Sequence, residues 1–312
     1  MNYSFGCDPD KFDERDYRLK SVLDPVFKDS VDLTHDPQTR WWIGEAHDQG
    51  ALGSCTAFAT NDMVRFVRYK TKLSTWPTSE LFTYYATRKL RGTTGEDSGA
   101  TAREALKATA DFGVTKAEVW PYDIAKFKDE PPKSAWEDAE KHQSLSYFRL
   151  DQTENDIIGC LSDGYPFIFG MKIYDSFFNY KESAVFDLVI PFPKPTKEKY
   201  HGGHCMLAVG YYKQNGKYII IIRNSWGINF GSLGYIHAPL DLILDSNFCF
   251  DLWTLRTSED ERPKPEPPKP YVPLEPVNPV TPEEPLVPFY KTKNFYFLLG
   301  LGVLAALFLL LK

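Results

Sequence analysis

The chain has 312 residues, of which 43% are hydrophobic and 25% are charged, a balance that is ordinary for a globular protein. Its formal net charge of -6 argues against binding to a phosphate backbone, so no nucleic-acid partner is predicted. The five cysteines are few and odd in number, which favours a reducing compartment and predicts no disulfide framework.

Near residue 50, a loop with two glycines delivers a cysteine to the start of a predicted helix. The loop is Asp48-Gln49-Gly50-Ala51-Leu52-Gly53-Ser54, and Cys55 follows it. Apolar residues then recur at positions 59, 63, 66 and 67, which is helical spacing. A helix N-terminus favours thiolate over thiol and can hold an oxyanion nearby. A lone cysteine is more often a small core residue, but the preceding Gln49 and the glycines favour a nucleophile.

Two further helices are predicted in the first half of the chain. The first opens at Thr78-Ser79-Glu80 and ends at Gly92. The second begins with the capping-box pattern Thr101-x-x-Glu104 and ends at Gly113. A loop containing Gly95 to Gly99 separates them.

From about residue 145 the sequence changes to apolar, β-rich runs. These are residues 145–150, 167–173, 202–211 and 218–223. A helical half followed by an antiparallel half predicts an α+β fold with the functional site between the two.

The second half of the chain supplies two candidate partners for the cysteine. His204 opens a buried strand and lies 149 positions after Cys55, a separation expected for a catalytic base of this kind. His201 is the nearest competing histidine. Asn224 begins the run Asn-Ser-Trp-Gly, where its amide could fix the orientation of an imidazole without adding a full charge.

In this order and with these neighbours, the three segments resemble the nucleophile, histidine and asparagine motifs of the papain-like cysteine peptidases. The resemblance covers residues 31–257 and implies a two-lobed α+β fold, with a helical lobe and an antiparallel, barrel-like lobe. It implies an endopeptidase that works through a thioester, in which Cys55 is the nucleophile and His204 the base. It further implies that Asn224 orients His204 and that Gln49 contributes to the oxyanion hole with the Cys55 N–H.

The same resemblance implies a set of substrate-binding residues and no metal or other cofactor. Gly99, with Ser98 before it, would offer main-chain hydrogen bonds to an extended substrate, although a simple helix-entry turn is the alternative. Cys205 would line a substrate pocket or only pack in its strand, and Trp226 would shield the His204–Asn224 hydrogen bond. Two residues depart from the family pattern: Thr56 stands where an aromatic residue is usual, and Leu52 where secreted members have a disulfide-bonded cysteine.

Residues 1–30 would then be an N-terminal extension before the peptidase domain. They are polar and acidic, and they lack the apolar segment of a secretory signal. Such an extension would either lie over the cleft as a short clip or pack on the surface, and we favour surface packing. We also expect the loop from Ser176 to Tyr200 to border the cleft, because it runs directly into His204.

Beyond residue 257 the composition changes sharply. Residues 258–293 are rich in proline and predict a semi-rigid spacer, or a ligand for an SH3- or WW-type domain. Phe295 to Leu311 contains no charge and would rise about 26 Å as a helix, near the lower limit for crossing a bilayer. Residues 294–312 are therefore predicted to be a transmembrane anchor, with the peptidase domain on the cytosolic side of a host or virion membrane.

This organisation is similar to that of the membrane-anchored cysteine proteinases of large DNA viruses such as iridescent viruses. One alternative is a catalytically silent protein of the same fold that docks partners through its proline-rich segment. Another is a transpeptidase or a deconjugating isopeptidase that uses the same nucleophile.

Overall fold

The computed structural model describes residues 3–19, 26–34, 44–179 and 189–258. The chain divides into two units, Met1–Pro263 and Lys264–Lys312. The predicted proline-rich spacer beyond Ser258 and the predicted anchor at residues 294–312 lie outside the described residues. Among the residues that are described, no helix is both long enough and apolar enough to cross a membrane.

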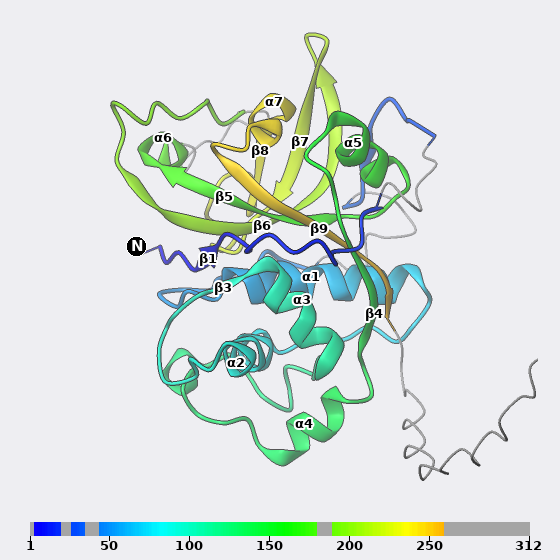
Figure 1. The fold of residues 1–312 in the computed structure, drawn as a ribbon, viewed down its shortest axis with the longest axis vertical. Coiled ribbons are helices and arrows are strands. Elements are labelled where there is room, and N and C mark those ends of the chain that lie inside the picture. The colour runs from blue at the N-terminus through cyan, green and yellow to red at the C-terminus, as the bar shows by residue number, and fades with distance from the viewer. Residues whose placement is uncertain (1–2, 20–25, 35–43, 180–188, 259–312) are drawn as a thin grey trace, which may run out of the picture. The chain divides into compact units, whose positions relative to one another are not determined.

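The first half of the chain forms a group of helices (Figure 1). They are α1 (Cys55–Lys70), α2 (Glu80–Arg91), α3 (Ala102–Asp111), the short 3-10 helix η3 (Ile124–Lys126) and α4 (Lys133–Ala139). The predicted capping signals are confirmed. Ser79 caps α2, Gly92 ends it in the left-handed conformation, and Thr101 and Glu104 form a reciprocal capping box at α3.

The second half forms an antiparallel sheet, as predicted. Its strands are β4 (Ser144–Arg149), β5 (Phe167–Tyr174), β6 (Tyr200–Gln214), β7 (Lys217–Arg223), β8 (Tyr235–Pro239) and β9 (Cys249–Ser258). They lie in the order β4-β9-β5-β6-β7-β8, and the short strand β2 (Val31–Asp32) pairs with β6. Three short helices accompany the sheet: α5 (Glu154–Ser162), α6 (Asp175–Phe178) and α7 (Leu240–Leu244). The predicted α+β class is therefore confirmed.

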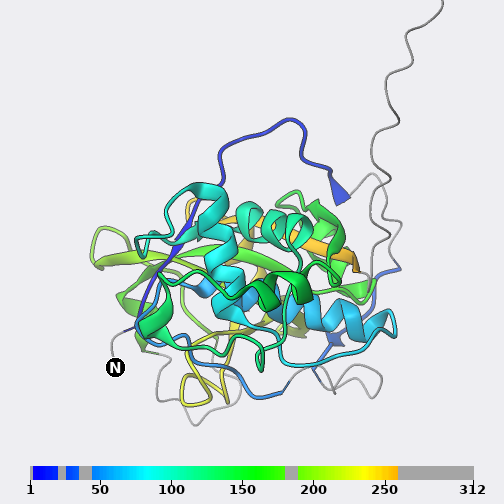
Figure 2. The same cartoon turned by 90° about the horizontal axis from the view of Figure 1, so that it is seen from below.

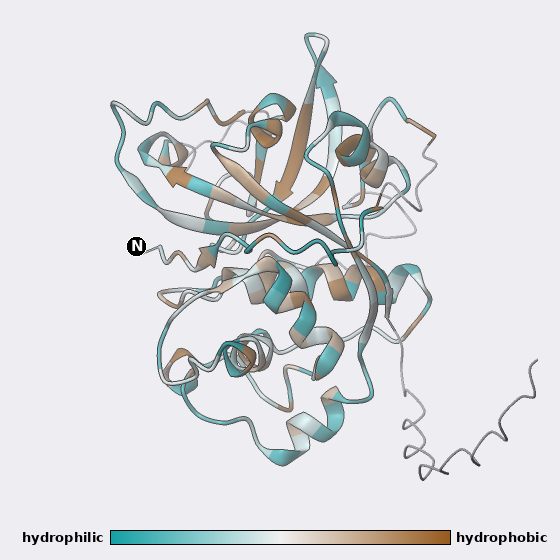
Figure 3. Cartoon of the chain, in the orientation of Figure 1, coloured by the Kyte–Doolittle hydropathy of each residue, from teal (hydrophilic) through white to brown (hydrophobic). Residues whose placement is uncertain are grey.

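The hydrophobic core lies where α1 packs against β6 and β9. Thirteen of the sixteen residues of α1 are buried, so this helix is covered on nearly all sides. Apolar residues also fill β5 and β7, which are largely brown in Figure 3. Because α1 is fixed between the other helices and the sheet, its first residue is held rigidly against the middle of β6.

The chain's N-terminal end runs between the two halves. The strand β1 (Cys7–Asp8) pairs in parallel with β3 (Ala100–Thr101), which precedes α3. Figures 1 and 2 show this blue segment passing between the helices and the sheet, close to the start of α1. We call residues 3–8 the N-terminal segment.

Candidate active site

Cys55 is the first residue of α1, and it lies at the contact between that helix and the sheet. Ser54 precedes it as the N-cap residue, and the side chain of Cys55 is fully buried. The backbone N–H of Cys205, on β6, donates a hydrogen bond to the Cys55 sulfur over 3.4 Å. Two segments 150 positions apart in the sequence are thus in direct contact at the predicted nucleophile.

His204 and Asn224 are joined as the sequence predicts. The His204 Nε2 atom lies 2.7 Å from the Asn224 Oδ1 atom, which also accepts a hydrogen bond from the Ser225 N–H. This arrangement places a proton on Nε2 and leaves Nδ1 as the nitrogen that can take a proton from a thiol. The Trp226 ring stacks on the imidazole with 4.4 Å between ring centroids and so covers the hydrogen bond. His201, the competing histidine, bonds instead to Asp175.

Gln49 is buried and held by the residue after the asparagine. Its Oε1 atom accepts a 2.6 Å hydrogen bond from the Ser225 hydroxyl, and its backbone N–H donates to the Ser225 carbonyl. The amide Nε2 atom therefore points the other way, toward the carbonyl oxygens of Leu52 at 2.9 Å and Ser4 at 3.3 Å. Nε2 is the donor that an oxyanion would use.

The N-terminal segment occupies the cleft over these residues, so our prediction of surface packing is wrong. The Tyr3 ring stacks on Trp226 at 4.4 Å, and the Ser4 carbonyl accepts from Gln49. The Gly6 carbonyl accepts a 2.8 Å hydrogen bond from the Ala100 N–H. Sequence patterns give little sign of such seating, because it depends on main-chain hydrogen bonds that any residue can make.

Glycines at the crossing points are a sequence signal for this seating. A Cβ atom at Gly6 would lie 1.9 Å from the Gly53 carbonyl oxygen, and one at Gly99 would lie 2.6 Å from the Gly6 carbonyl. Glycine is therefore required at position 6, where the segment crosses the nucleophile loop, and at position 99, in the loop before β3.

Two carbonyls of the segment are held by the cleft. The Ser4 carbonyl accepts a hydrogen bond from Gln49 Nε2, and the Gly6 carbonyl accepts one from the Ala100 N–H. The segment therefore covers the position that a substrate would take.

Burial under the segment holds both reacting groups in their neutral forms. Burial, with a smaller contribution from Cys7, raises the pKa of the Cys55 thiol to about 12. Burial also lowers the pKa of His204 to about 4, against the opposing effect of its bond to Asn224. The expected thiolate–imidazolium pair is therefore a property of the open, hydrated cleft.

The predicted substrate-binding residues lie around the segment in different ways. Gly99 has a φ of +64°, its N–H donates to the Tyr84 hydroxyl, and its neighbour Ala100 is the residue that bonds the segment. The Ser98 hydroxyl is bonded to Thr93 within its own loop. Cys205 is fully buried beside Cys55.

An aromatic cluster closes one end of the cleft. Phe178, at the end of α6, lies parallel to Trp226 and also stacks on Tyr3. Phe177 and Phe230 contact Trp226 edge-on. The beginning of the Ser176–Tyr200 loop thus borders the cleft as expected, and residues 180–188 lie outside the described residues.

Residues that the sequence does not single out anchor the segments that carry the predicted site residues. Arg223, directly before Asn224, is fully buried and forms a 2.6 Å ion pair with Asp62 of α1. It also donates to the carbonyls of Gly44 and Glu45. An arginine before a predicted site residue could have been noted as a candidate anchor, but nothing in the sequence indicates its partner.

With this geometry established, the fold and the site define a thiol protease. The papain-family cysteine protease model matches residues 28–242, and the chain belongs to that family. An uncharacterised peptidase C1-like protein of Acanthamoeba polyphaga mimivirus is 34% identical over 222 residues, which span 68% of this chain and 70% of that protein. A viral relative is therefore present, although it is a mimivirus protein and not one from an iridescent virus.

Other relatives are a plant enzyme and a bacterial one. Chymopapain of Carica papaya is 29% identical over 230 residues, spanning 72% of this chain and 58% of chymopapain. Xylellain, a cysteine protease from Xylella fastidiosa, has a solved structure with a TM-score of 0.71 and 31% identity. The comparison covers 81% of this chain and 96% of xylellain.

Proposed function

We propose that the protein is a cysteine endopeptidase that hydrolyses peptide bonds in protein substrates and is closed by its own N-terminal segment. The observation that carries the proposal is the meeting of three distant segments at one point. Cys55 contacts the Cys205 N–H, His204 bonds Asn224, and Gln49 bonds the residue that follows Asn224. The family's activity supports the same assignment.

The geometry gives each residue a role in acyl transfer. When the cleft is open, His204 Nδ1 takes the proton of Cys55, and the thiolate attacks the scissile carbonyl carbon. The resulting oxyanion accepts hydrogen bonds from Gln49 Nε2 and the Cys55 N–H. His204 then gives its proton to the leaving amine, and water hydrolyses the thioester with His204 as the base.

A thiol-directed epoxide probe tests the nucleophile in the full chain. Gly6→Ala places a Cβ against the Gly53 carbonyl, so it should displace the segment and speed the labelling of Cys55. Lys11→Ala, at an exposed position of the same extension, is the matched control and should label at the wild-type rate. Cys55→Ala should abolish labelling in the Gly6→Ala background. Labelling that persists without Cys55, or a folded Gly6→Ala protein that is not labelled, contradicts the proposal.

We also propose that a C-terminal helix tethers the enzyme to a membrane with its peptidase domain in the cytosol. The support is the uncharged run from Phe295 to Leu311 after the proline-rich spacer. Truncation after Tyr290 should move the protein from the membrane fraction to the soluble fraction. If the truncated and full-length chains are recovered in the same fraction, the residues after Tyr290 do not anchor the protein.

Deletion of the proline-rich spacer distinguishes the proposed peptidase from the alternative, a catalytically silent protein that binds partners. Removal of residues 263–288 should leave cleavage of a small peptide unchanged if catalysis is the function. If a protein with an SH3- or WW-type domain binds the full chain and the Cys55→Ala variant equally but not the deletion variant, the spacer is also a docking ligand.

A further inference from the structure

Three cysteine thiols meet where the N-terminal segment crosses the cleft. Cys7 comes from the segment, Cys55 from α1 and Cys205 from β6, and each is at most 4% exposed. All three are free thiols. Catalysis uses only Cys55, so the structure leaves two buried thiols next to the nucleophile without a role.

Cys7 and Cys205 are direct neighbours. The carbonyl of Cys7 lies against β6 so closely that a Cβ atom at Gly203 would come within 2.0 Å of it. Gly203 and Cys205 are two positions apart on one strand and therefore face the same side of the sheet. Each thiol is also the largest single influence on the pKa of the other, as expected for side chains that lie side by side.

This pair links the two parts that must separate before a substrate can bind. Cys7 lies in β1, whose pairing with β3 seats the segment, and Cys205 lies in the strand that carries His204. The contacts that hold residues 3–8 in the cleft are non-covalent. They include the ring stack on Trp226, main-chain hydrogen bonds to Gln49 and Ala100, and the ion pair of Asp8 with Arg91.

We propose that Cys7 and Cys205 form a disulfide site that locks the N-terminal segment into the cleft under oxidising conditions, an inference that rests on the proposed peptidase function. Hydrogen peroxide is a sufficient oxidant. One thiol is oxidised to a sulfenic acid, and peroxide is reduced to water. The second thiol then displaces the hydroxyl group, which leaves as water, and the sulfur–sulfur bond forms.

The seated pair is protected from this reaction until the segment moves. The interaction with Cys205 and burial both raise the pKa of Cys7. The interaction with Cys7 lowers the pKa of Cys205, but burial together with the neighbouring Cys55, Asp10 and Asp251 outweighs it and raises that pKa. Because the thiolate is the reactive form, the first oxidation takes place on Cys7 while the segment is out of the cleft, and its return closes the bond. Reduction by a dithiol opens it again.

The bond itself is tested in the full chain carrying Cys55→Ser, so that the result does not depend on activity or on oxidation of the nucleophile. After treatment with hydrogen peroxide, non-reducing peptide mapping should identify a Cys7–Cys205 crosslink, and the intact mass should fall by two hydrogen atoms. Adding Cys7→Ser or Cys205→Ser should remove the crosslink, whereas Cys249→Ser, a buried cysteine elsewhere in the sheet, should retain it. A folded Cys55→Ser chain that yields no such crosslink, or one that pairs either cysteine with another partner, overturns the proposal.

The consequence for the cleft is tested with the nucleophile present. Peroxide should slow epoxide labelling of Cys55 in the wild-type protein by about tenfold, and dithiothreitol should restore the original rate. In Cys7→Ser the nucleophile lacks this cover, so peroxide should oxidise it further and dithiothreitol should restore much less labelling. Equal recovery in the two proteins refutes the lock. A crosslink in a reduced protein that never labels at Cys55 would instead refute the peptidase function and leave the disulfide site standing.

Discussion

Gln49 is held at both ends of its side-chain amide, and this fixes which atom faces the cleft. The Ser225 hydroxyl binds Oε1, so Nε2 is turned toward the position where the Ser4 carbonyl now lies. The Ser4 oxygen occupies one half of the oxyanion site in the closed protein. The donor is therefore already in its working orientation before any substrate arrives.

Removal of this donor should affect kcat. In the Gly6→Ala background, Gln49→Ala should lower kcat for a fluorogenic peptide by about 100- to 1000-fold, because one oxyanion donor is lost. Ser225→Ala keeps the donor and loses only its restraint, so its decrease should be smaller. Steady-state kinetics that show a change in KM alone for Gln49→Ala contradict this role.

The neutral state of His204 makes closure of the cleft depend on pH. Burial lowers the pKa of His204 to about 4 in the closed form. In a Cys55→Ala background, where no thiolate pairs with the ring, hydration in the open form returns this pKa toward about 6.5. The closed form favours the neutral imidazole, so its advantage is complete above about pH 6.5. It falls by about 1.4 kcal/mol for each pH unit between about 6.5 and about 4.

Thermal unfolding measures this pH dependence. In the Cys55→Ala background, the difference in Tm between the chain with Gly6 and the chain with Gly6→Ala reports what the seated segment contributes, and it should shrink from neutral pH to near pH 4. In a His204→Gln background the difference should change less, because the titrating group is gone. An equal change in both backgrounds would assign the effect to the carboxylates of the segment.

At the scale of elements, a clasp of hydrogen bonds joins the nucleophile loop to the loop before β3. The carboxylate of Asp97 accepts from the Gly53 N–H with both oxygens at 3.1 Å, and it also accepts from the Tyr84 hydroxyl. Tyr84 in turn accepts from the Gly99 N–H at 3.1 Å. Leu52 is next to Gly53. From the resemblance in sequence, secreted members of the family are expected to have a disulfide-bonded cysteine at this position. Here a polar clasp joins these loops.

Asp97→Ala should loosen both loops at once. We expect a loss of about 1–3 kcal/mol in the free energy of unfolding, because buried donors lose their acceptor. We also expect a lower kcat/KM in the Gly6→Ala background. Asp97→Asn keeps one acceptor oxygen and should recover part of both losses. Urea unfolding and peptide kinetics on the same samples check this, and a loss of stability with unchanged kinetics would show that the clasp does not position the site.

The elements were largely predictable because their signals are local. Each signal lies in or next to the element that it defines. This holds for the capping residues of α2 and α3 and for the apolar runs of β5, β6 and β7. The Cys55, His204 and Asn224 positions were predictable because they lie in segments with distinctive neighbours. The seating of residues 3–8, the Arg223–Asp62 pair and the Asp97 clasp were not, because each depends on a partner far away in the sequence.

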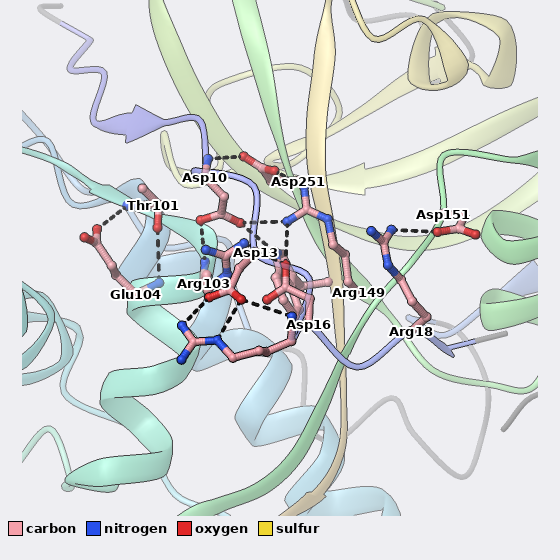
Figure 4. A network of polar contacts seen from close by, with 12 residues as sticks. Asp10, Asp13, Asp16, Arg18, Thr101, Arg103, Glu104, Arg149, Asp151 and Asp251 are labelled. Atoms are coloured by element: carbon pink, nitrogen blue, oxygen red, sulfur yellow. Dashed lines mark hydrogen bonds and ion pairs between the residues drawn. The ribbon is translucent and has the colours of Figure 1, made fainter. Parts of the chain in front are cut away.

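On the scale of the whole molecule, charged side chains tie the N-terminal extension to both halves of the protein (Figure 4). Arg149, on β4, forms ion pairs with Asp10 and Asp16 of the extension and with Asp251 of β9. Arg103, on α3, also binds Asp16. Burial and the nearby Asp10 raise the pKa of Asp251, although Arg149 opposes them.

Arg149→Ala should weaken the closed form, because Asp10 and Asp251 then face each other without their shared cation. We expect Cys55 to be labelled about tenfold faster by the epoxide probe. Arg15→Ala is the control, since Arg15 is exposed and, among the residues that the structure describes, its ion pair is with Asp13 of the extension. If the two variants label at the same rate, the Arg149 network does not hold the extension.

The seating of residues 3–8 on Gln49 and Ala100 also determines how inhibition by the segment responds to dilution of the protein. Since the inhibitor and the cleft belong to one chain, its effective concentration is a fixed property of the molecule, of millimolar order for short flexible connections. Latency should therefore be the same in a dilute and in a concentrated solution. A free peptide copying residues 3–8 should inhibit the Gly6→Ala enzyme only when its own concentration approaches that range.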